Sequence, residues 1–187
     1  MGRERGISLI ELSVVVAILG VIALIVMPNL SASSIQRLEL STQRVVDALQ
    51  FARSEALRTG ELTGVLIDVD DTVAIAKDIA VFVPDTSASP FALDRFVTHP
   101  LSKQPYDQWL ETAVGGSGVA FSGGVQSFEY DGLTGARNYV FFDANGAPVW
   151  LEDGKRYRLV AGSIYLALGT LGRQITIESV TGKVQVQ

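Results

Sequence analysis

The sequence predicts an α+β protein, in which one long N-terminal helix packs against an antiparallel β-sheet or a two-sheet β-sandwich. Two observations predict the helix: an apolar run at the start of the chain, and helix-favouring residues that continue as far as Arg58. A third predicts the sheet, because beyond Gly60 short apolar segments alternate with turn residues and no second long helical pattern follows. The 187 residues suffice for one medium-sized domain and an anchor.

The N-terminus consists of a short charged leader, residues 1–6, and an apolar run from Ile7 to Met27 whose one ionisable side chain is Glu11. About 20 apolar residues form a helix of roughly 30 Å, which is long enough to cross a bilayer. A carboxylate in such a helix costs on the order of 3 kcal/mol at mid-membrane. We therefore expect residues 7–28 to form a transmembrane or filament-core helix in which Glu11 has a specific role.

Gly6-Ile7-Ser8-Leu9-Ile10-Glu11, with the apolar run and Pro28, resembles the class III leader of type IV pilins and of the pseudopilins of type II secretion. That family usually has Phe and Thr where this chain has Ile7 and Ser8. The resemblance implies cleavage by a prepilin peptidase between Gly6 and Ile7, followed by N-methylation of Ile7. It also implies that Glu11 of a neighbouring subunit neutralises the new amine, since two charges that are costly in lipid are tolerated as a pair.

Two simpler interpretations of the N-terminus remain open. One is an ordinary secretory signal cleaved after Leu30-Ser31-Ala32, although the apolar core of such a signal is about 7 to 15 residues long. The other is a plain single-span anchor, in which Glu11 has no function.

The segment 29–59 is predicted to continue the helix as its amphipathic half. Pro28 lacks an N–H group and should kink the helix at that point. Thr59-Gly60 should end it, because glycine is a natural C-terminal stop. Apolar side chains recur at helical spacing on the face expected to be buried: Ile35, Leu38, Val45, Leu49, Ala52 and Ala56.

Residues 60–187 are predicted to form a β-rich globular domain. Gly64–Asp70 and Thr72–Val83 should pair as a hairpin about an Asp70-Asp71 turn, and Pro84–Pro105 should be a loop. Tight turns are expected at Asp143–Gly146 and Thr181-Gly182. The further predicted strands are Val125–Tyr130, Asn138–Phe142, Ala147–Leu151, Arg156–Ala161, Ser163–Leu168, Arg173–Glu178 and Lys183–Val186.

The later part of the chain resembles, more loosely, the GspH/FimT group of minor pseudopilins and minor pilins. The resemblance lies in Phe51–Gly60, Phe142–Gly146 and Ile175–Val184, and His99–Tyr106 is faintly similar to minor subunits of MSHA-type pili. The chain has no cysteine, whereas major pilins of this family often carry a C-terminal disulfide loop.

The GspH/FimT resemblance implies a non-enzymatic subunit of the type II secretion filament, anchored in the bacterial inner membrane with its C-terminal domain in the periplasm. A FimT- or MSHA-like minor pilin of a type IV pilus is the alternative. The implied partners are other major and minor pilins, the prepilin peptidase and the inner-membrane assembly platform.

The sequence offers no convincing catalytic or cofactor site. His99 is the single histidine, and without cysteine or a second histidine it cannot anchor a typical zinc site. No phosphate-binding P-loop is present, and Gly115-Gly116-Ser117-Gly118 lacks the last glycine of a nucleophile elbow. Asp68, Asp70 and Asp71 are interpreted as strand and turn residues rather than calcium ligands. We expect no enzyme activity, cofactor or bound metal.

Nucleic-acid binding is the functional alternative that the charges suggest. The net charge is -5, yet residues 154–187 carry five basic side chains against one acid, Glu178. Some FimT-type pilins bind DNA through a Gly-Arg-x-Arg motif, but Gly172-Arg173-Gln174-Ile175 lacks the second arginine. DNA contact would require several of the basic residues to converge: Lys155, Arg156, Arg158, Arg173 and Lys183.

Overall fold

The computed structural model describes residues 9–67, 78–87, 92–108, 118–121, 127–135, 137 and 139–187. Of residues 20–33, 108 and 127 it describes the backbone alone. The chain divides into two compact units, Met1–Gln36 and Arg37–Gln187. Each unit is described by itself below.

One helix, α1 (Leu9–Thr59), runs through the first unit and into the second. It ends where the sequence predicted, because Gly60 adopts φ 73° and its N–H group donates to the carbonyl oxygen of Ala56 at 2.9 Å. A left-handed residue at this position is the usual helix C-cap, and glycine adopts it without a steric penalty. The helix continues through Pro28, whose side chain lies outside the described part, so the kink stays a prediction.

The buried stripe of α1 in the second unit follows the predicted spacing. Leu38, Val45, Leu49, Ala52 and Ala56 are all at most 2% exposed and belong to one core with the strands. The prediction was wrong for Ile35, which is 49% exposed and lies in the first unit. The pattern did not predict the burial of Thr42, a polar residue whose hydroxyl donates to the carbonyl oxygen of Leu38 at 2.8 Å.

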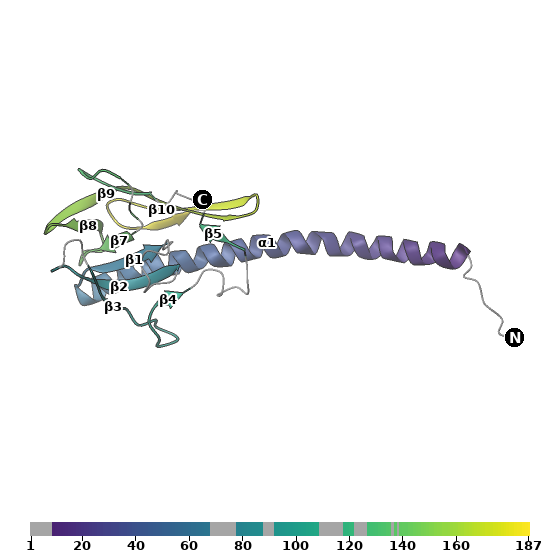
Figure 1. Ribbon diagram of the computed structural model, residues 1–187, viewed down its shortest axis with the longest axis horizontal. Coiled ribbons are helices and arrows are strands. Elements are labelled where there is room, and N and C mark those ends of the chain that lie inside the picture. The colour runs from purple at the N-terminus through teal and green to yellow at the C-terminus, as the bar shows by residue number, and fades with distance from the viewer. Residues whose placement is uncertain are drawn as a thin grey trace. The chain divides into compact units, whose positions relative to one another are not determined.

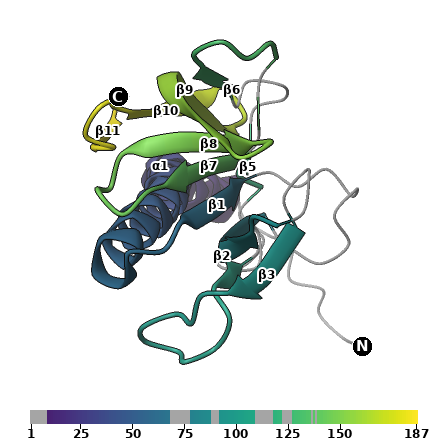
Figure 2. The same cartoon turned by 90° about the vertical axis from the view of Figure 1, so that its left-hand side faces the viewer.

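The described strands form one connected antiparallel sheet, in the order β11-β10-β9-β8-β7-β1-β2-β3, which is not closed. Short strands are added at the side, where β4 pairs with β2 and both β5 and β6 pair with β9. Figure 2 shows β1, β7 and β8 beside α1, with β2 and β3 farther along the sheet. The α+β architecture is therefore confirmed. The strands are β1 (Thr63–Ile67), β2 (Ile79–Asp85), β3 (Ala92–Phe96), β4 (Asp107–Gln108), β5 (Ala120–Phe121), β6 (Ser127–Tyr130), β7 (Tyr139–Phe142), β8 (Pro148–Glu152), β9 (Lys155–Leu168), β10 (Leu171–Ile177) and β11 (Val184–Val186).

The predicted hairpin is present as β1 and β2, which pair from Gly64↔Phe82 to Ile67↔Ile79. Asp78 is a bend, so β2 begins later than the sequence predicted. The predicted Asp70-Asp71 turn, and the three aspartates considered as calcium ligands, lie outside the described residues. β1 also pairs with β7, and this places β1 inside the sheet and explains why all five of its residues are buried.

The predicted loop Pro84–Pro105 is partly wrong, because β3 lies within it and pairs with β2. An isolated bridge, Thr98↔Pro105, then shapes the following segment. The sequence did not predict this strand, because the adjacent charged residues Asp94 and Arg95 interrupt the alternation of apolar and polar residues by which strands are recognised. An edge strand tolerates them because its outer side faces water.

β9 is a single strand where the sequence predicted two. Tyr130 pairs with Leu159 while Glu129 pairs with Ala161, so Val160 is an extra residue in β9. This bulge reverses the alternation, and the buried positions change from odd-numbered Leu159 to even-numbered Ile164. Gly162, which lies between the two predicted strands, pairs with Phe128 and Ile177 inside the continuous strand, which Figure 1 shows running on beside β10.

Candidate functional site

The described first turns of α1 are apolar on all sides and exposed within the single chain. Eight large apolar residues between Leu9 and Leu19 have exposed fractions between 48% and 83%. A helix that is hydrophobic all round requires an apolar environment, either lipid or other helices. In the part of the chain that the structure describes, no helix meets both the length and the hydropathy needed to cross a membrane.

Glu11 is exposed and lies in the first turn of α1, where the helix dipole favours a negative charge. Gly6 and Ile7, the predicted cleavage site, lie outside the described residues. The Glu11 carboxylate therefore lies among exposed apolar side chains. The amine of Ile7, its expected partner, lies outside the described residues.

The five basic residues considered for DNA contact are spread along the sheet. Lys155, Arg156 and Arg158 lie at the start of β9, beside β8. Arg173 pairs with Leu166, which is eight residues beyond Arg158 and about 26 Å away along an extended strand. Lys183 precedes β11, at the far end of β10 from Arg173.

Arg173 is also engaged in the monomer, since its Nε atom lies 3.4 Å from Oε2 of Glu39 on α1. The fold therefore separates the basic residues and pairs one of them with an acid. A phosphate-binding patch instead requires several unpaired cations close together.

His99 has a structural place in the turn that follows β3. Its Nδ1 atom accepts hydrogen bonds from the N–H groups of Leu101 and Ser102, both at 3.2 Å. Its ring lies 4.7 Å from that of Tyr106, centroid to centroid. Among the described residues, no three metal-ligating side chains gather at one place.

Tyr106 anchors this turn to the helix. Its ring stacks on that of Phe51 with centroids 5.3 Å apart and an interplanar angle of 17°. Only 4% of the residue is exposed. Burial, with a smaller contribution from the Asp47 carboxylate, raises the pKa of the Tyr106 hydroxyl to about 12.

A cleft at the end of α1 is a feature that the sequence did not predict. We call it the terminal cleft; its volume is about 690 Å³, within the range of ligand-sized sites. One wall is the last two turns of α1, and the others are the β2–β3 edge and the turn that contains Pro100 and Lys103. No local signal could have revealed it, because its walls come from three separate segments of the chain.

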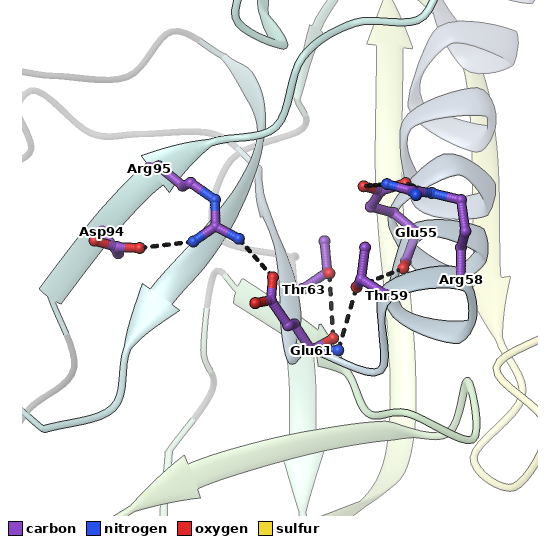
Figure 3. Close-up of polar contacts among 7 residues, drawn as sticks. All are labelled: Glu55, Arg58, Thr59, Glu61, Thr63, Asp94 and Arg95. Carbon is purple, nitrogen blue, oxygen red and sulfur yellow. Dashed lines mark hydrogen bonds and ion pairs between the residues drawn. The ribbon is translucent and has the colours of Figure 1, made fainter.

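Ion pairs line the terminal cleft, as Figure 3 shows for the end of α1 and β3. Arg58 forms two hydrogen bonds with Glu55, of 2.9 and 2.5 Å, and these hold the pKa of the Glu55 carboxyl below its usual range. Arg95 pairs with Glu61 at 2.5 Å and with Asp94 at 2.9 Å. The cleft is therefore lined both by these charged groups and by the apolar side chains of Phe51, Val83 and Phe96.

Comparison with known proteins identifies the N-terminus. Residues 1–27 match the prokaryotic N-terminal methylation motif. The crystal structure of the type IV minor pilin FimU from Pseudomonas aeruginosa PAO1 is similar, with a TM-score of 0.43 and 16% sequence identity, over 80% of this chain and 91% of FimU. No curated protein matches the chain.

The methylation motif, followed by a long helix and an antiparallel sheet, defines a type IV pilin-like protein. The resemblance that the sequence suggested is thus confirmed at this level. A pilin-like protein with this motif implies assembly with other pilins and processing by a prepilin peptidase.

Proposed function

We propose that the chain is a minor pseudopilin, a non-enzymatic structural subunit of the periplasmic filament of a type II secretion system. The observation that carries the proposal is the N-terminal methylation motif followed by a helix whose apolar side chains are exposed around Glu11. Burial of such a helix in lipid, and later among other helices, supplies the free energy for anchoring and assembly.

In this proposal the prepilin peptidase cleaves between Gly6 and Ile7, and the amine of Ile7 is then methylated. Glu11 of a neighbouring subunit pairs with that amine and fixes the axial register of the helices. The helix 7–28 first anchors the protein in the inner membrane, with residues 60–187 in the periplasm. Pro28 provides a kink between the two halves of the helix.

A minor pilin of a type IV pilus is the second candidate, because both machines use subunits with this N-terminus. The similarity of Phe51–Gly60 to the GspH/FimT group favours a minor subunit, but it does not distinguish a type II secretion system from a type IV pilus. Deleting the gene in the host distinguishes the two. Loss of protein secretion with normal surface pili supports the pseudopilin, and loss of pili supports the minor pilin.

Replacing Glu11 tests the assembly role. Glu11→Ala should be inserted in the membrane and cleaved normally but should be at least tenfold depleted from isolated filaments. Val14→Ala is the control, because it shortens an apolar side chain three residues further along α1 and leaves Glu11 in place. This variant should be incorporated. Incorporation of Glu11→Ala at the wild-type level would remove the register role.

A further inference from the structure

Asn145 and Gly146 form an asparagine–glycine pair in the turn before β8, and it is the one such pair in the sequence. Asparagine is chemically labile, most of all before glycine, because glycine has no Cβ atom to hinder the approach of its nitrogen to the preceding side chain. Asn145 is exposed, and its side-chain amide forms no hydrogen bond with any described residue. The carbonyl carbon of this amide is therefore open to attack.

The reaction that this pair supports is deamidation, whose single co-reactant is water. The deprotonated main-chain nitrogen of Gly146 attacks the Cγ atom of Asn145, so that an N–Cγ bond forms, the Cγ–Nδ2 bond breaks and the side-chain nitrogen leaves as ammonia. Water then opens the cyclic succinimide at either of its carbonyl carbons. One opening gives aspartate, and the other gives isoaspartate, in which the main chain runs through the former side-chain carbon.

The folded turn opposes the first step of this reaction. The Gly146 N–H group donates to the carbonyl oxygen of Asp143 at 2.8 Å, so the attacking nitrogen is occupied. Oδ1 of Asp143 accepts hydrogen bonds from the N–H groups of Asn145 at 2.9 Å and Ala147 at 3.0 Å. These hydrogen bonds fix the main chain on both sides of the Asn145 side chain. The Gly146 nitrogen is therefore free to attack only when the turn opens.

Two contacts with other segments hold the turn closed. Nε of Arg53 on α1 donates to the carbonyl oxygen of Gly146 at 3.2 Å. Gly182, in the turn before β11, packs against the same oxygen so closely that no side chain would fit there. We call the meeting point of Arg53, Gly146 and Gly182 the junction. Opening of the turn requires the junction to separate, which is a local event that leaves the rest of the sheet in place.

We propose that Asn145 is a deamidation site whose reaction rate is set by the opening of the junction. The reaction also prevents closure, because isoaspartate adds one main-chain atom directly before Gly146, whose carbonyl oxygen is held from two sides. The modification therefore converts a transient opening into a permanent one. The site is independent of the N-terminus and of the filament role, so it adds to the proposed function without resting on it.

Peptide mass spectrometry of the full chain in detergent tests the site. The chain is held at mildly alkaline pH, which favours the deprotonated nitrogen, and is digested after increasing times. The tryptic peptide Asn138–Lys155 should gain the mass difference between OH and NH₂, and fragmentation should assign the gain to Asn145. Asn138 is the internal control, because the bulky Tyr139 follows it. Asn145→Gln should abolish the gain, since the longer side chain does not form the succinimide.

Replacing Arg53 tests the role of the junction. Arg53→Ala should raise the deamidation rate of the folded chain about tenfold, as expected when one hydrogen bond from a charged donor is lost. Arg37→Ala, the same change at an exposed position of α1, is the matched control and should leave the rate unchanged. Unfolding in denaturant should give the fastest rate, because none of the contacts of the turn then remains.

Hydrogen exchange separates local from global opening in these variants. The five residues of β1 are buried inside the sheet, so exchange of their amides reports on unfolding of the whole domain. Arg53→Ala should accelerate deamidation by a larger factor than exchange in β1. Three results would overturn the proposal: no gain of mass at Asn145, equal deamidation rates in Arg53→Ala and Arg37→Ala, or an equal acceleration of exchange in β1.

Discussion

Gly182 packs directly against the backbone of Gly146, so closely that a Cβ atom at Gly182 would lie 2.6 Å from the Gly146 carbonyl oxygen. The same oxygen accepts a hydrogen bond from Nε of Arg53 on α1 at 3.2 Å. The turn before β8, the turn before β11 and the helix therefore meet at one point. Both turns were predicted from sequence, but their contact was not.

Replacing Gly182 with alanine should destabilise the domain strongly. Gly182 has φ 67°, where an L-residue costs roughly 1–2 kcal/mol, and the added methyl group must also displace the Gly146 carbonyl. We expect a loss of about 3 kcal/mol in the free energy of unfolding, measured by denaturant titration of the full chain in detergent. Gly169→Ala is the matched control, because Gly169 has φ 62° with nothing within 4 Å, and about 1 kcal/mol should be lost. Equal losses for the two variants would contradict the close contact.

The hydroxyl of Tyr106 should ionise at a higher pH than that of an ordinary tyrosine. Burial raises its pKa from 10.0 to about 12, and burial also raises the pKa of Tyr130. The stability that protonated Tyr106 contributes is fully present below pH 10 and is lost as the pH rises through about 12. An absorbance titration of phenolate should show fewer than five tyrosines ionising with ordinary pKa values.

Tyr106→Phe provides the check on that assignment. The variant retains the stacking on Phe51 and should lose one late-titrating phenolate, with less loss of stability on going above pH 10. If the late-titrating fraction is the same in both proteins, Tyr106 is not the residue responsible.

Gly6→Ala should block processing of the N-terminus. The methylation motif covers this residue, and the added methyl group changes the residue immediately before the proposed cleavage site. With a prepilin peptidase coexpressed, we expect the intact mass of the variant to include residues 1–6. Gly2→Ala, in the same leader but away from the cleavage site, should be processed normally. A mature Gly6→Ala protein that begins at Ile7 would invalidate the leader assignment.

The separated basic residues should not support DNA binding. Arg173 is paired with Glu39, and Arg156 and Arg158 lie about 26 Å or more from it along β9. Gel shifts of the full chain with duplex DNA should show no complex whose amount falls as salt rises. A salt-sensitive complex that the double variant Arg156→Gln, Arg158→Gln abolishes would instead establish the DNA-binding alternative.

Much of the fold was predictable because short stretches of the sequence specify it. Helical spacing from Leu38 to Ala56 marked the buried face of α1, and Gly60 marked its end. The errors occurred where tertiary pairing overrides the local pattern. β3 is a strand because β2 provides its hydrogen bonds, and β9 stays continuous because β6 accommodates the bulge at Val160.

The sequence alone determined the methylation motif, the apolar helix with its single carboxylate, and the α+β class, because each depends on residues close together in the chain. Tertiary structure decided what the distant residues do. It brought Lys103, Phe51 and Val83 to one cleft, paired Arg173 with Glu39 across 134 residues, and kept the other basic residues apart. The physical reason is that a strand's register and neighbours arise from long-range packing, which no short window of sequence encodes.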